Sequence, residues 1–134
     1  MASIAASRRL LVLTLVAVAA LAGALLLARG DQPAGAATSK ALRLSADATG
    51  KLKFNKTSLT ATHGKISLVM SNPGSSGTAH AIAVQGKGVD KDGKTVSPGG
   101  TSRLTLTLKK GTYTFYCPVD GHRAAGMKGR LVVK

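Results

Sequence analysis

Residues 113–133 read YTFYCPVDGHRAAGMKGRLVV, and this stretch determines how the rest of the chain is interpreted. Its flanks, residues 113–117 and 127–133, alternate between two sets of side chains with a period of two, which is typical of half-buried β-strands. Between them, Pro118 fixes φ and Gly121 permits a positive φ, so both suit a tight reversal of the chain. The stretch therefore predicts two strands joined by a compact loop.

The same period of two continues outward from this stretch toward the N-terminus. Apolar residues alternate with polar neighbours at Leu42 and Leu44, at Leu52 and Phe54, at Ile66, Leu68 and Met70, and at Leu104, Leu106 and Leu108. Turn signals rich in Gly, Pro and Asn separate these runs. We expect about eight short strands and no helix after residue 36, which predicts an all-β sandwich or barrel with a modest core.

Four potential metal donors fall on this β pattern. Cys117, His122 and Met127 follow one another at intervals of five residues, and His80 lies on an upstream strand-like run. A thiolate, two imidazoles and a thioether form the ligand set of a blue-copper electron-transfer site. Strand alternation gives His80, Cys117 and Met127 the parity of core residues. Each has an ordinary explanation alone, such as a histidine bonded to backbone, but together they predict one metal centre.

Cys117 is the only cysteine, so it cannot form a disulfide within its own chain. In an oxidising compartment a free thiol is vulnerable unless it is buried, joined to another chain or bound to metal. A buried, inert thiol in a metal-free adhesion or wall-binding sandwich is one alternative. A Cys117–His122 nucleophile and base is another, but no orienting or oxyanion group accompanies the pair, so an enzyme is not expected.

The first 36 residues differ from the rest of the chain. Arg8 and Arg9 precede a charge-free, mostly apolar run of 19 residues, 10–28, and Ala34-Gly35-Ala36 offers a cleavage site. We expect residues 1–36 to form a hydrophobic helix and tether, acting as a signal peptide or an uncleaved membrane anchor, with residues 37–134 as the folded domain. The two arginines also hint at a twin-arginine signal. Either way the domain is expected outside the cytoplasm, on the periplasmic or extracellular face of the membrane.

Charge indicates the kind of partner. The chain has a net charge of +14, and residues 37–134 retain +12 with no glutamate. Such a surface attracts anionic partners in a salt-sensitive way. We expect an acidic redox protein, steered by Arg123 and the lysines, with an anionic membrane surface or an acidic wall polymer as alternatives. Nucleic acid is not expected, because the four aromatic residues do not interleave with the lysines.

Residues 41–134 resemble the cupredoxins, the plastocyanin and azurin group of small blue-copper proteins. The resemblance rests on residues 72–80, which run from Asn-Pro-Gly to a histidine, on the cysteine-bearing strand 113–117, and on the closing segment 126–133. It implies a Greek-key β-sandwich with copper at one end.

By that resemblance His80, Cys117 and His122 would be the equatorial ligands of one type 1 copper ion, and Met127 the axial ligand. The function implied is transfer of single electrons between redox partners, of the cytochrome or oxidase type, by a monomer. A copper module for storage, delivery or sensing would use the same ligands and remains the alternative.

Two positions depart from the family pattern. Ala81 stands where the family often has Asn, and Pro118 stands where Ser or Thr commonly follows the cysteine. The side-chain hydrogen bonds around the metal are therefore in question, and backbone donors from Ala81 and Val119 are the expected substitutes.

The remaining segments carry weaker signals. The Gly-rich segment 85–100 is expected to be a plain connection or a mobile docking loop. Within it, residues 90–93 read Asp-Lys-Asp-Gly but lack the further acids of a calcium loop, so they predict a turn. His63 lies between strands and is expected to be exposed to solvent.

Overall fold

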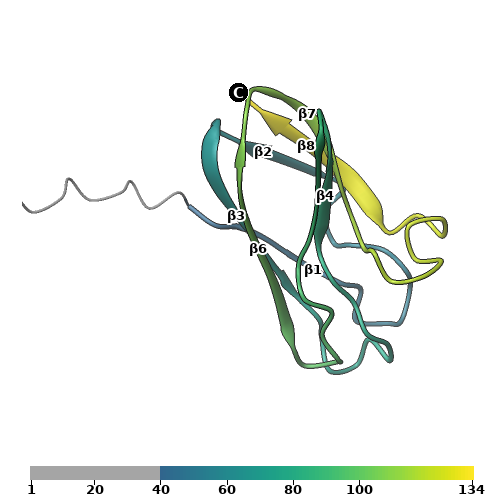
Figure 1. The fold of residues 1–134 in the computed structure, drawn as a ribbon. Coiled ribbons are helices and arrows are strands. Elements are labelled where there is room, and N and C mark those ends of the chain that lie inside the picture. The colour runs from purple at the N-terminus through teal and green to yellow at the C-terminus, as the bar shows by residue number, and fades with distance from the viewer. Residues whose placement is uncertain (1–39) are drawn as a thin grey trace, which may run out of the picture. The chain divides into compact units, whose positions relative to one another are not determined.

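The computed structural model describes residues 40–134, which form eight β-strands and no helix (Figure 1). The strands are β1 (Leu42–Ser45), β2 (Ser58–Ala61), β3 (Gly64–Ser71), β4 (Ala83–Gly86), β5 (Val89–Asp92), β6 (Thr101–Leu108), β7 (Gly111–Tyr116) and β8 (Lys128–Val133). The prediction of an all-β fold of about eight strands is confirmed. The predicted helix and tether of residues 1–36 lie outside the described residues. Within the described range no helix is long and apolar enough to cross a bilayer.

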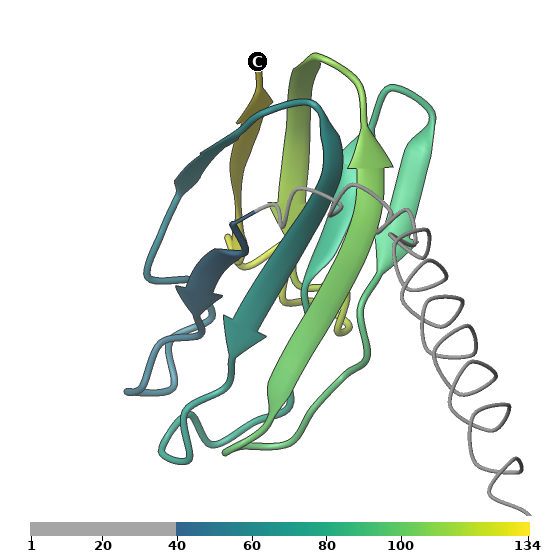
Figure 2. The same ribbon diagram turned by 90° about the vertical axis from the view of Figure 1, so that its left-hand side faces the viewer.

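The strands form two sheets that lie face to face (Figures 1 and 2). One sheet has three strands in the order β1-β3-β6, and the other has five in the order β2-β8-β7-β4-β5. The pairs β1–β3 and β2–β8 are parallel, and the remaining pairs are antiparallel. The predicted two-layered sandwich is therefore present.

The core lies between the two sheets and follows the alternation read from the sequence. In β6, Ser102, Leu104 and Leu108 face inward and are buried, whereas the threonines between them are exposed. Phe115 of β7 is fully buried, and its ring lies 5.7 Å from that of Phe54 across the core. One apolar cluster built from both sheets includes the side chains of Cys117 and Met127.

Two details differ from the sequence-based expectation. The run at Leu52 and Phe54, predicted as a strand, forms only an isolated bridge between Ala46 and Phe54. Phe54 is nevertheless buried. Alternation in the sequence indicates which side chains are buried, and it does not show that the backbone pairs with another strand. The segment 85–100 is also more regular than predicted, since it contains β5, and the prediction of a turn at residues 90–93 is wrong because residues 90–92 belong to that strand. That strand is exposed along most of its length at the edge of the sheet, so no apolar alternation marks it.

Candidate metal centre

The donor residues lie just outside the ends of regular strands. Cys117 directly follows β7, and Met127 directly precedes β8. His80 lies three residues before β4 and forms an isolated antiparallel bridge with Val96, in which each backbone N–H donates to the carbonyl of the other residue, at 3.1 and 2.9 Å. Strand pairing between β4 and β7 therefore places the backbone near His80 beside Cys117.

The loop from Cys117 to Met127 is closed by its own backbone hydrogen bonds. The N–H of Cys117 donates to the carbonyl of Met127, and the N–H of Met127 donates to the carbonyl of His122, each at 3.0 Å. Gly121 and Gly126 have φ values of 77° and 106°, which fit the two predicted bends. The backbone thus joins three of the predicted ligands directly.

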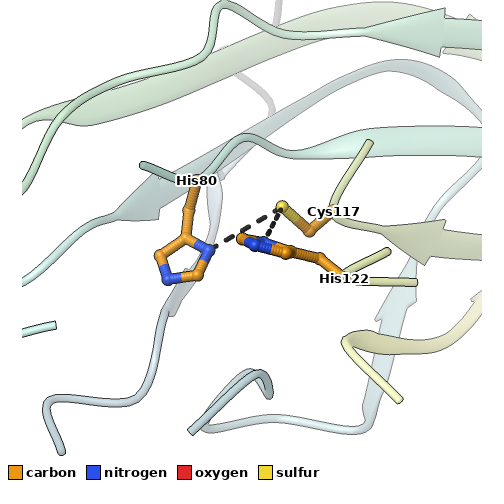
Figure 3. A group of neighbouring side chains, drawn as sticks. All are labelled: His80, Cys117 and His122. Carbon is orange, nitrogen blue, oxygen red and sulfur yellow. Dashed lines mark hydrogen bonds between the residues drawn. The ribbon is translucent and has the colours of Figure 1, made fainter. Parts of the chain in front are cut away.

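Three of the four predicted donor side chains converge (Figure 3). The Cys117 sulfur lies 3.5 Å from Nδ1 of His122 and 3.8 Å from Nδ1 of His80. One potential ligand atom from each residue lies within 4.8 Å of the others. His80 and Cys117 are fully buried, and His122 is 8% exposed. Met127 is fully buried in the same apolar cluster as Cys117.

The chemical state of these donors suits a metal ion. Burial, and then the proximity of His122, lower the pKa of His80, which favours the neutral imidazole that a metal requires. The Nδ1 atom of His80 faces the sulfur, while its Nε2 atom points away and has no hydrogen-bond partner among the described residues (Figure 3). Two imidazole nitrogens and one free thiol, brought together by three buried residues, fit copper.

The sulfur receives one of the two predicted backbone contacts. The N–H of Ala81 donates to the Cys117 sulfur at 3.5 Å. The other candidate, Val119, makes no such bond among the described residues; instead its carbonyl accepts a hydrogen bond from the N–H of His122. Ala81 therefore contributes through its backbone, although it lacks the side chain usual at that position.

The residue that supports His80 is Asn72, which the sequence did not mark as part of the site. Asn72 is 1% exposed, and its Nδ2 donates to the carbonyls of Thr78 and Val96 at 2.9 and 3.1 Å. Its Oδ1 accepts a hydrogen bond from the hydroxyl of Ser76 at 2.6 Å. Because Val96 is the bridge partner of His80, Asn72 holds the backbone around that histidine. Its place in an Asn-Pro-Gly turn signal gave no indication of burial.

Arg123, which the sequence predicts to steer a partner, also makes contacts within the domain. It is half-buried, and its guanidinium lies 4.2 Å above the ring of Tyr116. Its Nη2 donates to Oε1 of Gln85 at 2.8 Å, and the Tyr116 hydroxyl donates to Asp90 at 3.1 Å. Burial, and then the bond to Asp90, raise the pKa of Tyr116. Arg123 therefore ties the loop that carries His122 to the outer face of the five-stranded sheet.

Comparison with known proteins agrees with this centre. The family described as copper binding proteins, plastocyanin/azurin family, matches residues 41–134. No match is found among curated proteins.

Three solved structures share the fold. The dithionite-reduced auracyanin of the photosynthetic bacterium Roseiflexus castenholzii is 24% identical, with a TM-score of 0.63 over 72% of this chain and 98% of that chain. Auracyanin B is 23% identical, with a TM-score of 0.61 over 70% and 88%. A copper nitrite reductase from Nitrosomonas europaea is 20% identical, with a TM-score of 0.57 over 71% and 41%. Since the matched part of this chain spans nearly the whole of the first auracyanin, it has the extent of a complete folding unit.

Proposed function

Because the chain belongs to the plastocyanin/azurin family of copper-binding proteins, the cupredoxins, we propose that it carries single electrons between redox partners. Copper is the cofactor of this family, and one bound ion would supply the Cu(I)/Cu(II) couple. The observation that carries the proposal is the convergence of the Cys117 sulfur with Nδ1 of both His80 and His122 inside the sandwich.

The proposed ligand set is the one predicted from the sequence. His80, Cys117 and His122 would form the equatorial plane, and Met127 would be the weak axial ligand. Cys117 and Met127 are joined through their backbones, and both belong to the buried core. A site whose ligands are fixed by the core can change little between oxidation states, which favours rapid electron transfer.

Electrons would pass between the copper ion and a redox partner through His122. His122 is mostly buried, with 8% of its surface exposed, and it lies on a loop whose residues Ala124 and Ala125 are exposed. Pro118 and Val119 are half-buried on the same loop. These residues would form a small apolar surface suited to brief docking, and the surrounding positive charge would attract an acidic redox protein.

The setting of the domain is also part of the proposal. The arginines before the apolar run 10–28 support export, with residues 37–134 working as a monomer on the periplasmic or extracellular face. We propose no enzymatic activity. The chain covers only 41% of the nitrite reductase chain that it resembles in fold, so the reaction named for that protein is not carried over.

Voltammetry and electron self-exchange of the copper-loaded domain test the proposal. We expect a reversible one-electron wave and rapid exchange, and His122→Gly should alter the visible spectrum and slow the exchange. A domain that binds copper tightly but exchanges electrons slowly would support storage, delivery or sensing instead. An unchanged spectrum and exchange rate in His122→Gly would remove His122 from the site.

A further inference from the structure

The end of the sandwich opposite the metal centre carries five exposed lysines, which we call the lysine end: Lys65, Lys87, Lys109, Lys110 and Lys134. The turns β2–β3, β4–β5 and β6–β7 meet there, together with the end of β8 (Figure 2). Strand pairing fixes this grouping, since Gly64 pairs with Leu108 and Gly111 pairs with Val133. Cys117 lies at the far end of β7, about 20 Å away at the usual rise per residue.

No aspartate lies in these turns. Among the described residues Asp47 and Asp120 lie in connections at the other end, and Asp90 and Asp92 lie on β5. Asp90 is the aspartate nearest in sequence to the β4–β5 turn, and its two carboxylate oxygens accept hydrogen bonds from Tyr116 and Gln85. The turns of the lysine end therefore carry basic side chains with no acidic side chain among them to offset the charge.

Lys87 shows how the lysines are held close together. Its Nζ donates to the carbonyl of Lys110 at 3.4 Å, so the turn β4–β5 lies against the turn β6–β7. Like charges gathered this way repel one another, and an anionic surface relieves that repulsion.

We propose that the lysine end docks on the headgroups of an anionic membrane, with the metal centre facing away from the bilayer. This goes beyond the proposed electron transfer, because it concerns the face that a partner at His122 would not touch. Each lysine near an anionic bilayer strengthens binding about fivefold. The five together form a polybasic surface of the size that binds such lipids.

The chain itself favours a membrane over an acidic protein. β1 runs parallel to β3, from the lysine-end side toward the metal centre, so the chain enters β1 from the lysine-end side. The apolar run 10–28 precedes it in the sequence, and the 13 residues between that run and β1 can span at most about 45 Å. A bilayer holding that run would lie within reach of the lysine end.

The test is sedimentation of residues 37–134 with vesicles of phosphatidylcholine, with and without phosphatidylglycerol. We expect binding only to the anionic vesicles, with release by salt. Replacing Lys65, Lys109 and Lys110 by glutamine should weaken binding about a hundredfold, from the fivefold effect of each lysine.

The matched control replaces three exposed lysines elsewhere, Lys51, Lys91 and Lys94, by glutamine, which removes the same charge. It should weaken binding less than tenfold. Equal losses in both triple variants would show that net charge alone drives binding and would overturn the proposal. So would equal binding to neutral vesicles, or binding to polyglutamate without binding to vesicles, which would assign the surface to an acidic protein.

A second measurement uses the unmodified domain and does not depend on variants that fold. Acetylation of vesicle-bound protein, read by mass spectrometry, should protect Lys65, Lys109 and Lys110 but not Lys51 or Lys94. Uniform protection would overturn the proposed orientation. Neither readout depends on copper, so a negative result for membrane docking leaves the proposed electron transfer intact. A negative result for electron transfer likewise leaves the docking proposal intact.

Discussion

Replacement of Asn72 by alanine tests how the sandwich holds the first histidine of the metal centre. The buried amide bonds to the carbonyls of Thr78 and Val96 and to the hydroxyl of Ser76. Val96 in turn exchanges two backbone hydrogen bonds with His80. The substitution therefore removes the side chain that links the turn after β3 to the bridge partner of a predicted ligand.

The three lost hydrogen bonds set the expected size of the effect. A net value of about 1 kcal/mol for each gives a loss of about 3 kcal/mol in the free energy of unfolding. In a domain of this length, that lowers Tm by about 12–24 °C. Because the loss falls beside His80, copper affinity should decrease as well. The copper-loaded domain should then be destabilised more than the metal-free domain.

The assay is urea unfolding of residues 37–134 with and without copper. Asn55→Ala is the matched control, since Asn55 is exposed and its side chain accepts one hydrogen bond, from the N–H of Ser45 at 2.8 Å. We expect Asn55→Ala to lower the free energy of unfolding by less than about 1 kcal/mol and to leave the copper affinity unchanged. If the two variants lost equal stability and bound copper equally, the assigned role of Asn72 would be wrong.

Two further substitutions test the loop and the strand next to it. Arg123→Met removes the contacts with Gln85 and Tyr116, worth about 1 kcal/mol, and should speed copper loss to a chelator about fivefold. Gly129→Ala would place a methyl group in steric conflict with Cζ of buried Phe115 and 2.7 Å from its Cε1 and Cε2 atoms. This overpacking should lower the free energy of unfolding by about 1–3 kcal/mol, measured by thermal unfolding.

Each has a control of the same chemical type. Arg103→Met changes an exposed arginine on the other sheet and should leave copper loss unchanged; an equal effect would show that net charge, and not the contacts of Arg123, sets the rate. Gly74→Ala adds a methyl group where no atom lies within 4 Å, so it should change the free energy of unfolding by less than about 0.5 kcal/mol. Equal stability of Gly74→Ala and Gly129→Ala would contradict the packing argument.

The sequence predicted the sandwich because the core-facing positions of its longer strands keep a strict period of two. Leu104 and Leu108 of β6 are buried as the alternation required, and Phe115 of β7 is fully buried. Elements without an apolar signature could not be found that way. β5 consists of Val89–Asp92 and owes its place to backbone pairing with β4, which leaves no mark on residue type.

The metal centre was predictable because a blue-copper site needs uncommon residue types. Cys117, His122 and Met127 lie on one loop, so their spacing was visible, and strand parity added His80. The residues that support them were less visible. Asn72 and Arg123 are common polar residues, and only the folded chain shows that one is buried and that the other bonds to Gln85.

Titration of the metal-free domain, residues 37–134, with Cu(II) tests the central claim most directly. We predict one copper per chain, an intense visible thiolate-to-copper charge-transfer band, and the loss of that band in Cys117→Ser. Absence of the band in the unmodified domain, or its persistence in Cys117→Ser, would contradict the proposed set of donors, which is His80, Cys117, His122 and Met127.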